Sequence, residues 1–130
     1  PSMNLLTISP IYLALLGILF IPFTMRVGAY RMKNKVNLGD GGDPELIKRI
    51  RGQGNFVETV PLAILLIVVM EVLGAGDMWL HGLGTALVAG RFLHYLGVTA
   101  RGQFVCRPIG MFATLAVYLV APVWILVAVL

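Results

Sequence analysis

The second apolar stretch of the chain, residues 56–73, reads FVETVPLAILLIVVMEVL and decides the fold. Its length is close to the roughly 20 residues that a helix needs to cross the hydrocarbon core of a bilayer. Three more apolar stretches of similar length are Leu5–Met25, Met78–Val98 and about Ile109–Leu130. Helices satisfy their own backbone hydrogen bonds in lipid, so the pattern predicts four transmembrane helices.

The composition also indicates a membrane environment. The chain has 130 residues, of which 58% are hydrophobic and only 12% are charged. A soluble domain of this length could not bury so much apolar surface. We therefore expect an all-α integral membrane protein: one domain over residues 1–130, folded as a four-transmembrane-helix bundle with up-down topology. The predicted spans are about residues 5–31, 45–73, 78–98 and 107–130.

The charge and cysteine content exclude several classes of partner. The net charge is +4, but basic residues gathered at the ends of membrane spans are an ordinary topology signal, so we expect no nucleic-acid partner. Cys106 is the single cysteine, which rules out an intrachain disulfide and any cysteine-based metal motif. No metal site is expected.

The basic residues predict the orientation of the bundle. Seven of them belong to the first connection and its flanks, and three more lie in or near the third: Arg26, Arg31, Lys33, Lys35, Lys48, Arg49 and Arg51, then Arg91, Arg101 and Arg107. The second connection, Gly74–Asp77, has none. The positive-inside rule then places connections one and three in the cytoplasm and both termini on the opposite side. The membrane would be a bacterial inner (plasma) membrane or the endoplasmic reticulum.

The first connection contains a strong signal for the start of the second helix. Residues 37–44 read NLGDGGDP, a loop composition with three glycines and a proline. Asp43 is a plausible N-cap, Pro44 suits the first helical position and Glu45 is a first-turn acid. The second helix should therefore have a polar first part before it becomes apolar.

Polar side chains inside the spans form two stripes. Arg51, Asn55 and Glu58 follow an i, i+4, i+7 spacing, which puts them on one face of the second helix. Arg91 and His94 share a face of the third helix. An ionisable group costs about 2.5–3.5 kcal/mol at the centre of a span, so such groups usually face the bundle interior or a wet cavity. With Arg107 at the start of the fourth helix, we expect the stripes to meet in one pocket.

Structural interpretations of the same residues stay open. Glu58 and Arg91 could form a buried ion pair that only fixes helix packing. Lys48, Arg49 and Arg51 could be interfacial topology determinants, and His94 an ordinary interfacial histidine. Cys106 beside Arg107 could be a reactive thiol or a small buried side chain.

The chemistry of the predicted pocket favours a small ligand with more negative than positive charge. Arginines bind carboxylates through paired hydrogen bonds, and a carboxylate binds an ammonium group. An arginine close to a ligand thiol would also favour the thiolate, which is the nucleophilic form.

The segment Arg51–Pro61 resembles the second-helix signature of the MAPEG family (membrane-associated proteins in eicosanoid and glutathione metabolism). That signature reads R-x-x-x-N-x-x-E with a proline soon after, and residues 91–94, RFLH, are similar to the family's R-x-x-H/Y. The resemblance extends over nearly the whole chain, including its length and the polar loop after the first span.

The resemblance implies a homotrimer that binds glutathione between neighbouring subunits near the cytoplasmic face. Arg51, Asn55 and Glu58 would hold the glutathione backbone, with Glu58 on the amino group. Arg31 would bind a carboxylate from a neighbouring subunit. The remaining roles fall to Arg91 and His94, which would complete the wall, and to Arg107, which would stabilise the thiolate; Arg101 competes with Arg107 for that role.

These assignments imply a membrane glutathione transferase or peroxidase that acts on lipophilic electrophiles. Val98 and Pro108 depart from the enzymes of the family, which often carry a tyrosine and a hydroxyl donor at these positions. A non-catalytic MAPEG-type protein that binds a lipid or a partner is therefore an alternative. A small membrane scaffold or transporter is the third, although one protomer has few helices and no pair of broken helices.

Overall fold

The computed structural model describes residues 5–100 and 105–130 and confirms the all-α class. It has four helices in up-down order, α1 (Ser9–Asn34), α2 (Pro44–Val72), α3 (Asp77–Thr99) and α4 (Cys106–Val129). The bounds of α2, α3 and α4 lie within one residue of the predicted spans. Helix α1 begins at Ser9 rather than at residue 5, with Pro10 in its first turn, where proline fits without loss of a hydrogen bond.

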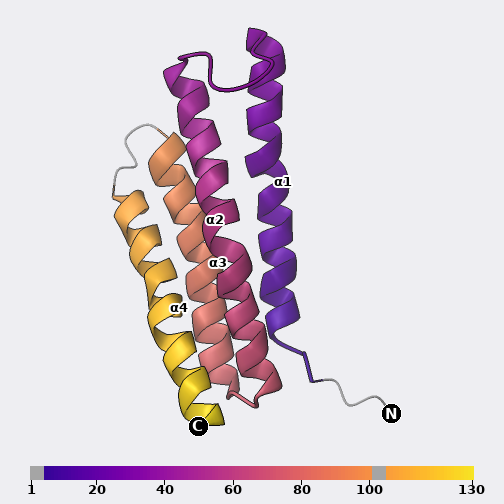
Figure 1. The fold of residues 1–130 in the computed structure, drawn as a ribbon, viewed down its shortest axis with the longest axis vertical. Coiled ribbons are helices and arrows are strands. Elements are labelled where there is room, and N and C mark those ends of the chain that lie inside the picture. Colours follow the sequence, from indigo (N-terminus) through magenta and orange to yellow (C-terminus); the bar gives the residue numbers. More distant parts are fainter. Residues whose placement is uncertain (1–4, 101–104) are drawn as a thin grey trace.

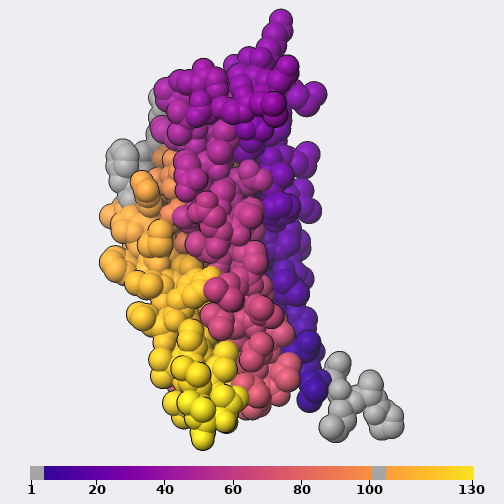
Figure 2. All heavy atoms as spheres, in the orientation of Figure 1, coloured from indigo at the N-terminus to yellow at the C-terminus, as the bar shows by residue number. Residues whose placement is uncertain are grey.

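The helices form one bundle, in which α1 and α2 extend beyond α3 and α4 at one end (Figure 1). The space-filling view shows the α1–α2 connection projecting at that end (Figure 2). The α2–α3 turn, the start of α1 and the end of α4 lie at the other end. The core between the helices contains Leu16, Phe23, Ile67, Leu87 and Val117.

Three of the described helices, α1, α2 and α4, are long and apolar enough to cross a membrane by length and composition. Helix α3 is not among them, in contrast to the prediction of four apolar spans. The physical reason is its load of Asp77, His81, Arg91 and His94. Arg91 and His94 are buried against the other helices, so much of the polarity of α3 is hidden inside the bundle.

Glycines bring α3 and α4 into close contact. A Cβ atom at Gly90 would lie 2.7 Å from the Cβ of Ala113, and a Cβ at Gly110 would overlap the backbone of α3 at Gly90 and His94. Small residues allow backbones to approach closely, which drives helix association in lipid through van der Waals packing. The close packing of α3 against α4 therefore depends on glycine, which has no side chain, at positions 90 and 110.

Gly110→Ala is expected to lower the free energy of unfolding by about 1–3 kcal/mol, because the added methyl group forces α3 and α4 apart. Gly82→Ala in α3 is the matched control, since a Cβ there meets no atom within 4 Å. The measurement is thermal unfolding in detergent, followed by circular dichroism. Equal melting temperatures for the two variants would contradict the close-contact interpretation.

The end at which α1 and α2 project is held by the predicted helix cap. Asp43 Oδ1 accepts hydrogen bonds from the backbone N–H of Glu45 (2.9 Å) and of Leu46 (3.4 Å), which confirms its N-cap role. Tyr30 donates its hydroxyl hydrogen to Asp43 Oδ2 at 2.7 Å, and Arg49 lies over the Tyr30 ring at 4.6 Å. The Tyr30 hydrogen bond is the main cause that lowers the pKa of Asp43 below its usual value.

The opposite end is held by Glu71, a residue that sequence reasoning missed. Its buried carboxylate accepts hydrogen bonds from the backbone N–H of Thr7 (3.2 Å), Ile8 (2.8 Å) and Ser9 (2.9 Å), and from the Ser9 hydroxyl (2.7 Å). The first N–H groups of a helix have no partner within it, and an anion there complements the helix dipole. Glu71 is thus a cap for α1 supplied by α2.

Glu71→Ala is expected to destabilise the bundle by at least about 1–3 kcal/mol, the cost of leaving a buried donor unpaired. Hydrogen exchange should accelerate at the amides of Ile8 and Ser9. Glu45→Ala is the control, because the Glu45 carboxylate forms a partly exposed pair with Arg49, at 3.0 Å, at the other end of α2. Unchanged exchange at Ile8 in Glu71→Ala would refute the capping role.

Candidate functional site

A polar cavity of about 570 Å³ lies between α2, α3 and α4, toward the end where α1 and α2 project. It is lined by Lys48, Arg51 and Asn55 of α2, by His94, Gly97 and Val98 of α3, and by Arg107 of α4. Four of the residues predicted for the site therefore line one cavity: Arg51, Asn55, His94 and Arg107. None of the described lining residues is acidic, so the cavity offers hydrogen-bond donors and positive charge.

The local structure explains how three helices supply these side chains. Arg51 and Asn55 are one helical turn apart on α2, as their spacing predicts. A Cβ at Gly97 would overlap the backbone of Arg107, so this glycine lets the start of α4 lie directly against α3. That contact brings Arg107 to the cavity. Arg101, the competing candidate, lies outside the described residues.

Arg91 lies behind the cavity rather than in its wall. Its side chain is 1% exposed, and its donors contact neutral oxygens on two neighbouring helices. Nε donates to Thr114 Oγ1 at 2.8 Å, and Nη1 donates to Asn55 Oδ1 and to Thr59 Oγ1 at 3.0 Å. Nη2 is buried and has no hydrogen-bond partner among the described residues.

The possible ion pair between Glu58 and Arg91 does not form in this structure. Glu58 instead lies 3.7 Å from Arg51, and the side chains of both residues are more than half exposed on the flank of the protomer. An exposed pair of this kind contributes little to stability. Glu58 lies one helical turn beyond Gly54 and is not among the residues that line the cavity; it is next to the cavity residue Arg51.

Arg31 belongs to a separate cavity of about 460 Å³ at the end of α1. The residues around it are Gly28, Met32, Lys35, Val36 and Asn37. Its Nη2 donates to the carbonyl oxygen of Gly39 at 3.0 Å, which ties it to the first connection. Within one protomer, Arg31 does not join the other predicted residues.

Sequence reasoning missed the two threonines that hold Arg91. Each hydroxyl donates to the carbonyl four residues earlier: Thr59 to Asn55 (2.8 Å) and Thr114 to Gly110 (3.0 Å). Such bonds are common for threonine in helices, so neither residue stands out in the sequence. The only signal was the i+4 spacing of Thr59 from Asn55.

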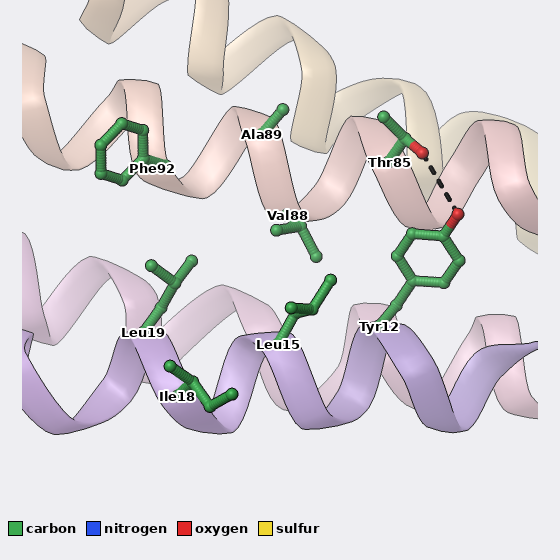
Figure 3. A pocket seen from close by; sticks show the side chains of 8 residues that line it. All are labelled: Tyr12, Leu15, Ile18, Leu19, Thr85, Val88, Ala89 and Phe92. Atoms are coloured by element: carbon green, nitrogen blue, oxygen red, sulfur yellow. Dashed lines mark hydrogen bonds between the residues drawn. The ribbon is translucent and has the colours of Figure 1, made fainter.

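A second hollow, of about 390 Å³, separates α1 from α3 (Figure 3). Its walls are apolar: α1 contributes Leu15, Ile18 and Leu19, and α3 contributes Val88, Ala89 and Phe92. Tyr12 and Thr85 close one end, where their oxygens are 3.3 Å apart, and Tyr12 also contacts His81 at 2.6 Å. Phe92 and His94 are two residues apart on a helix, so this hollow and the polar cavity face different directions.

Comparison with known proteins shows the family of this chain. The sequence model of the MAPEG family matches residues 9–127. The chain belongs to the MAPEG family. It is 42% identical over 107 residues to the inner membrane protein YecN of Escherichia coli K12, a match that covers 82% of this chain and 81% of the relative. The YecN of Escherichia coli O6:H1 strain CFT073 matches equally well. This MAPEG protein is therefore an integral membrane protein.

Proposed function

We propose that this MAPEG protein is a membrane-bound transferase or peroxidase that binds glutathione, its co-substrate, in the polar cavity. The observation that supports the proposal is the cavity itself: four predicted residues from three helices surround a space without an acidic side chain. Glutathione has two carboxylates and one ammonium group, so most of its charge matches this lining. Paired hydrogen bonds from arginine suit carboxylates in particular.

In the proposed binding mode, Arg51 holds a carboxylate and Asn55, which also lines the cavity, contacts a ligand oxygen. Glu58, next to Arg51, binds the ammonium group. His94 forms the α3 wall and Arg107 approaches the thiol from α4. Arg31 contributes from a neighbouring subunit, as the family resemblance implies, since it lies in a different cavity of its own protomer.

The proposed chemistry requires a thiolate. A guanidinium group beside the thiol favours loss of its proton, because it stabilises the negative charge on sulfur. In conjugation, the sulfur forms a bond to an electrophilic carbon and the leaving group departs with its electron pair. In peroxide reduction, two glutathione molecules are oxidised to the disulfide while the hydroperoxide is reduced to an alcohol and water. The lipophilic co-substrate would come from the membrane.

The function test combines binding and thiolate formation. Glutathione should raise the melting temperature of the wild type, and the ultraviolet absorbance band of the thiolate should grow on titration. Arg51→Ala should weaken binding about tenfold, equivalent to about 1.4 kcal/mol. Arg107→Ala should abolish the thiolate band while binding persists. Lys33→Ala, a change at an exposed residue outside the cavity, serves as control.

The same test separates the alternatives. Val98 lines the cavity at a position where enzymes of the family often carry a tyrosine, which favours a binding protein without catalysis. Thermal protection with neither thiolate nor conjugation of a generic electrophile would support that alternative. Absence of any effect of glutathione at millimolar concentration would overturn both and leave a membrane scaffold.

We also propose a homotrimer, oriented with connections one and three in the cytoplasm. Arg51 and Glu58 support a trimer because they are exposed on the flank of one protomer, where Glu58 is near the middle of α2. Charges at such a depth are costly in lipid and usually face a protein interior or a wet cavity. A second copy of the chain would cover them. The inner membrane is the proposed location, as for the relative.

Glu58→Leu is expected to weaken glutathione binding, because it removes the proposed partner of the ammonium group.

The wild type should have a mass of three chains by native mass spectrometry in detergent. Leu62→Glu places a new charge on an exposed position of α2, four residues from Glu58, and should reduce the trimer signal if this flank is an interface. Glu45→Gln, outside the flank, is the control. A monomeric wild type would refute the trimer.

A further inference from the structure

The buried Arg91 side chain holds the amide of Asn55, which lines the polar cavity. We propose that Arg91 is a positioning residue: it fixes the Asn55 side chain with its carbonyl inward and its NH2 group toward the cavity. This position then accepts only an oxygen of the ligand, such as a carboxylate or carbonyl oxygen, and rejects a donor. The proposal deepens the proposed function, on which the identity of the ligand rests.

The first step concerns the direction of the two hydroxyl groups beside Arg91. Thr59 and Thr114 each donate their only hydroxyl hydrogen to a carbonyl of their own helix. Their oxygens are therefore left as acceptors, and both accept from the guanidinium, at 3.0 Å and 2.8 Å. A guanidinium has donors only, so in both contacts Arg91 donates and the threonine oxygen accepts.

The second step concerns the amide. Oxygen and nitrogen of an asparagine side chain are assigned from their partners. The partner here is Arg91 Nη1, a donor without acceptor capacity, so the Asn55 atom that faces it must be the oxygen. Thr59 and Thr114 hold the guanidinium in place, and the amide cannot flip without leaving a buried N–H opposite an NH2 group. Such a clash of donors costs a hydrogen bond and its desolvation.

The third step concerns charge. Arg91 is 1% exposed and has no acidic side chain within ion-pair distance among the described residues. A buried charge held only by neutral oxygens keeps much of its field, because the surroundings screen it poorly. The field adds to that of Lys48, Arg51 and Arg107 in the cavity wall. The cavity wall at Asn55 thus attracts an anionic oxygen, and the ligand ammonium is directed to Glu58, which lies outside the lining, 3.7 Å from Arg51.

The test measures discrimination rather than affinity alone. Dissociation constants of glutathione and its two monocarboxamides are determined by calorimetry in detergent. In a monocarboxamide of glutathione, one negatively charged carboxylate is replaced by a neutral amide whose NH2 group is a hydrogen-bond donor. Wild type should discriminate against at least one monocarboxamide. Arg91→Met should reduce that discrimination about tenfold, because the freed Asn55 amide can turn and accept a hydrogen bond.

Two threonine variants separate positioning from general stability. Thr114→Ser keeps the acceptor for Arg91 Nε and should retain the discrimination of the wild type, whereas Thr114→Val should reduce it. Thr99→Val removes an equivalent hydroxyl, bonded to the Tyr95 carbonyl at 2.8 Å, and should change nothing. Unchanged discrimination in both Arg91→Met and Thr114→Val would overturn the proposal, as would an equal loss in Thr99→Val. If Arg91→Met does not fold, the threonine set decides.

A ligand-free readout distinguishes failure of this proposal from failure of the proposed function. The side-chain carbonyl ¹³C resonance of Asn55 should differ from that of Asn34, whose amide instead donates to the Tyr30 carbonyl. It should shift toward the Asn34 value in Arg91→Met and stay in place in Thr99→Val. If wild type ignores glutathione but this shift occurs, only the ligand assignment fails. If the Asn55 resonance does not respond to Arg91→Met, the positioning role is wrong.

Discussion

The guanidinium group of Arg91 must find its hydrogen-bond partners inside the protein, and much of the bundle is arranged around that requirement. It lies where α2, α3 and α4 meet and receives one oxygen from Asn55, one from Thr59 and one from Thr114. An unpaired polar group costs several kcal/mol in hydrocarbon. The network therefore favours one alignment of the three helices. Because Asn55 also lines the cavity, the same contacts connect the packing of the bundle to its ligand chemistry.

Two further devices fix the remaining freedom. Glycines at positions 90, 97 and 110 let α3 and α4 approach until backbone lies against backbone, and this closeness brings Arg107 to the cavity. Helix α1 is held at both ends by carboxylates outside its own sequence. Glu71 binds its first N–H groups, and Asp43 binds the hydroxyl of Tyr30 near its last turn. The two carboxylates thus fix the orientation of α1, which apolar packing alone would fix only weakly.

The polar cavity and the exposed flank of α2 are connected by one stripe of polar side chains. Arg51 and Glu58 extend the polar stripe of α2 out of the cavity and onto a surface with apolar neighbours such as Val57 and Leu62. A single protomer leaves that stripe uncovered. In the proposed trimer a neighbouring copy would cover it, and Arg31 would reach the cavity of another chain, as the family resemblance implies. The proposed trimer and the proposed glutathione site therefore depend on the same few charges.

The sequence alone determined the number of helices and the bounds of α2, α3 and α4, because apolar length, the Asp43–Pro44 cap and glycine-rich turns are local signals. The bounds of α1, Ser9–Asn34, differ from the predicted 5–31 at both ends. Helical spacing also puts costly polar residues on common faces, and on that basis the sequence predicts one pocket from six residues: Arg51, Asn55, Glu58, Arg91, His94 and Arg107. The cavity is lined by four of them, whereas Glu58 and Arg91 are not among its lining residues. Only the tertiary structure decided the partner of Arg91, because a threonine hydroxyl and a glutamate are equally possible neighbours until helix rotation is known. The role of Glu71 was hidden for the same reason: its partners are backbone N–H groups more than 60 residues away, which carry no sequence signature.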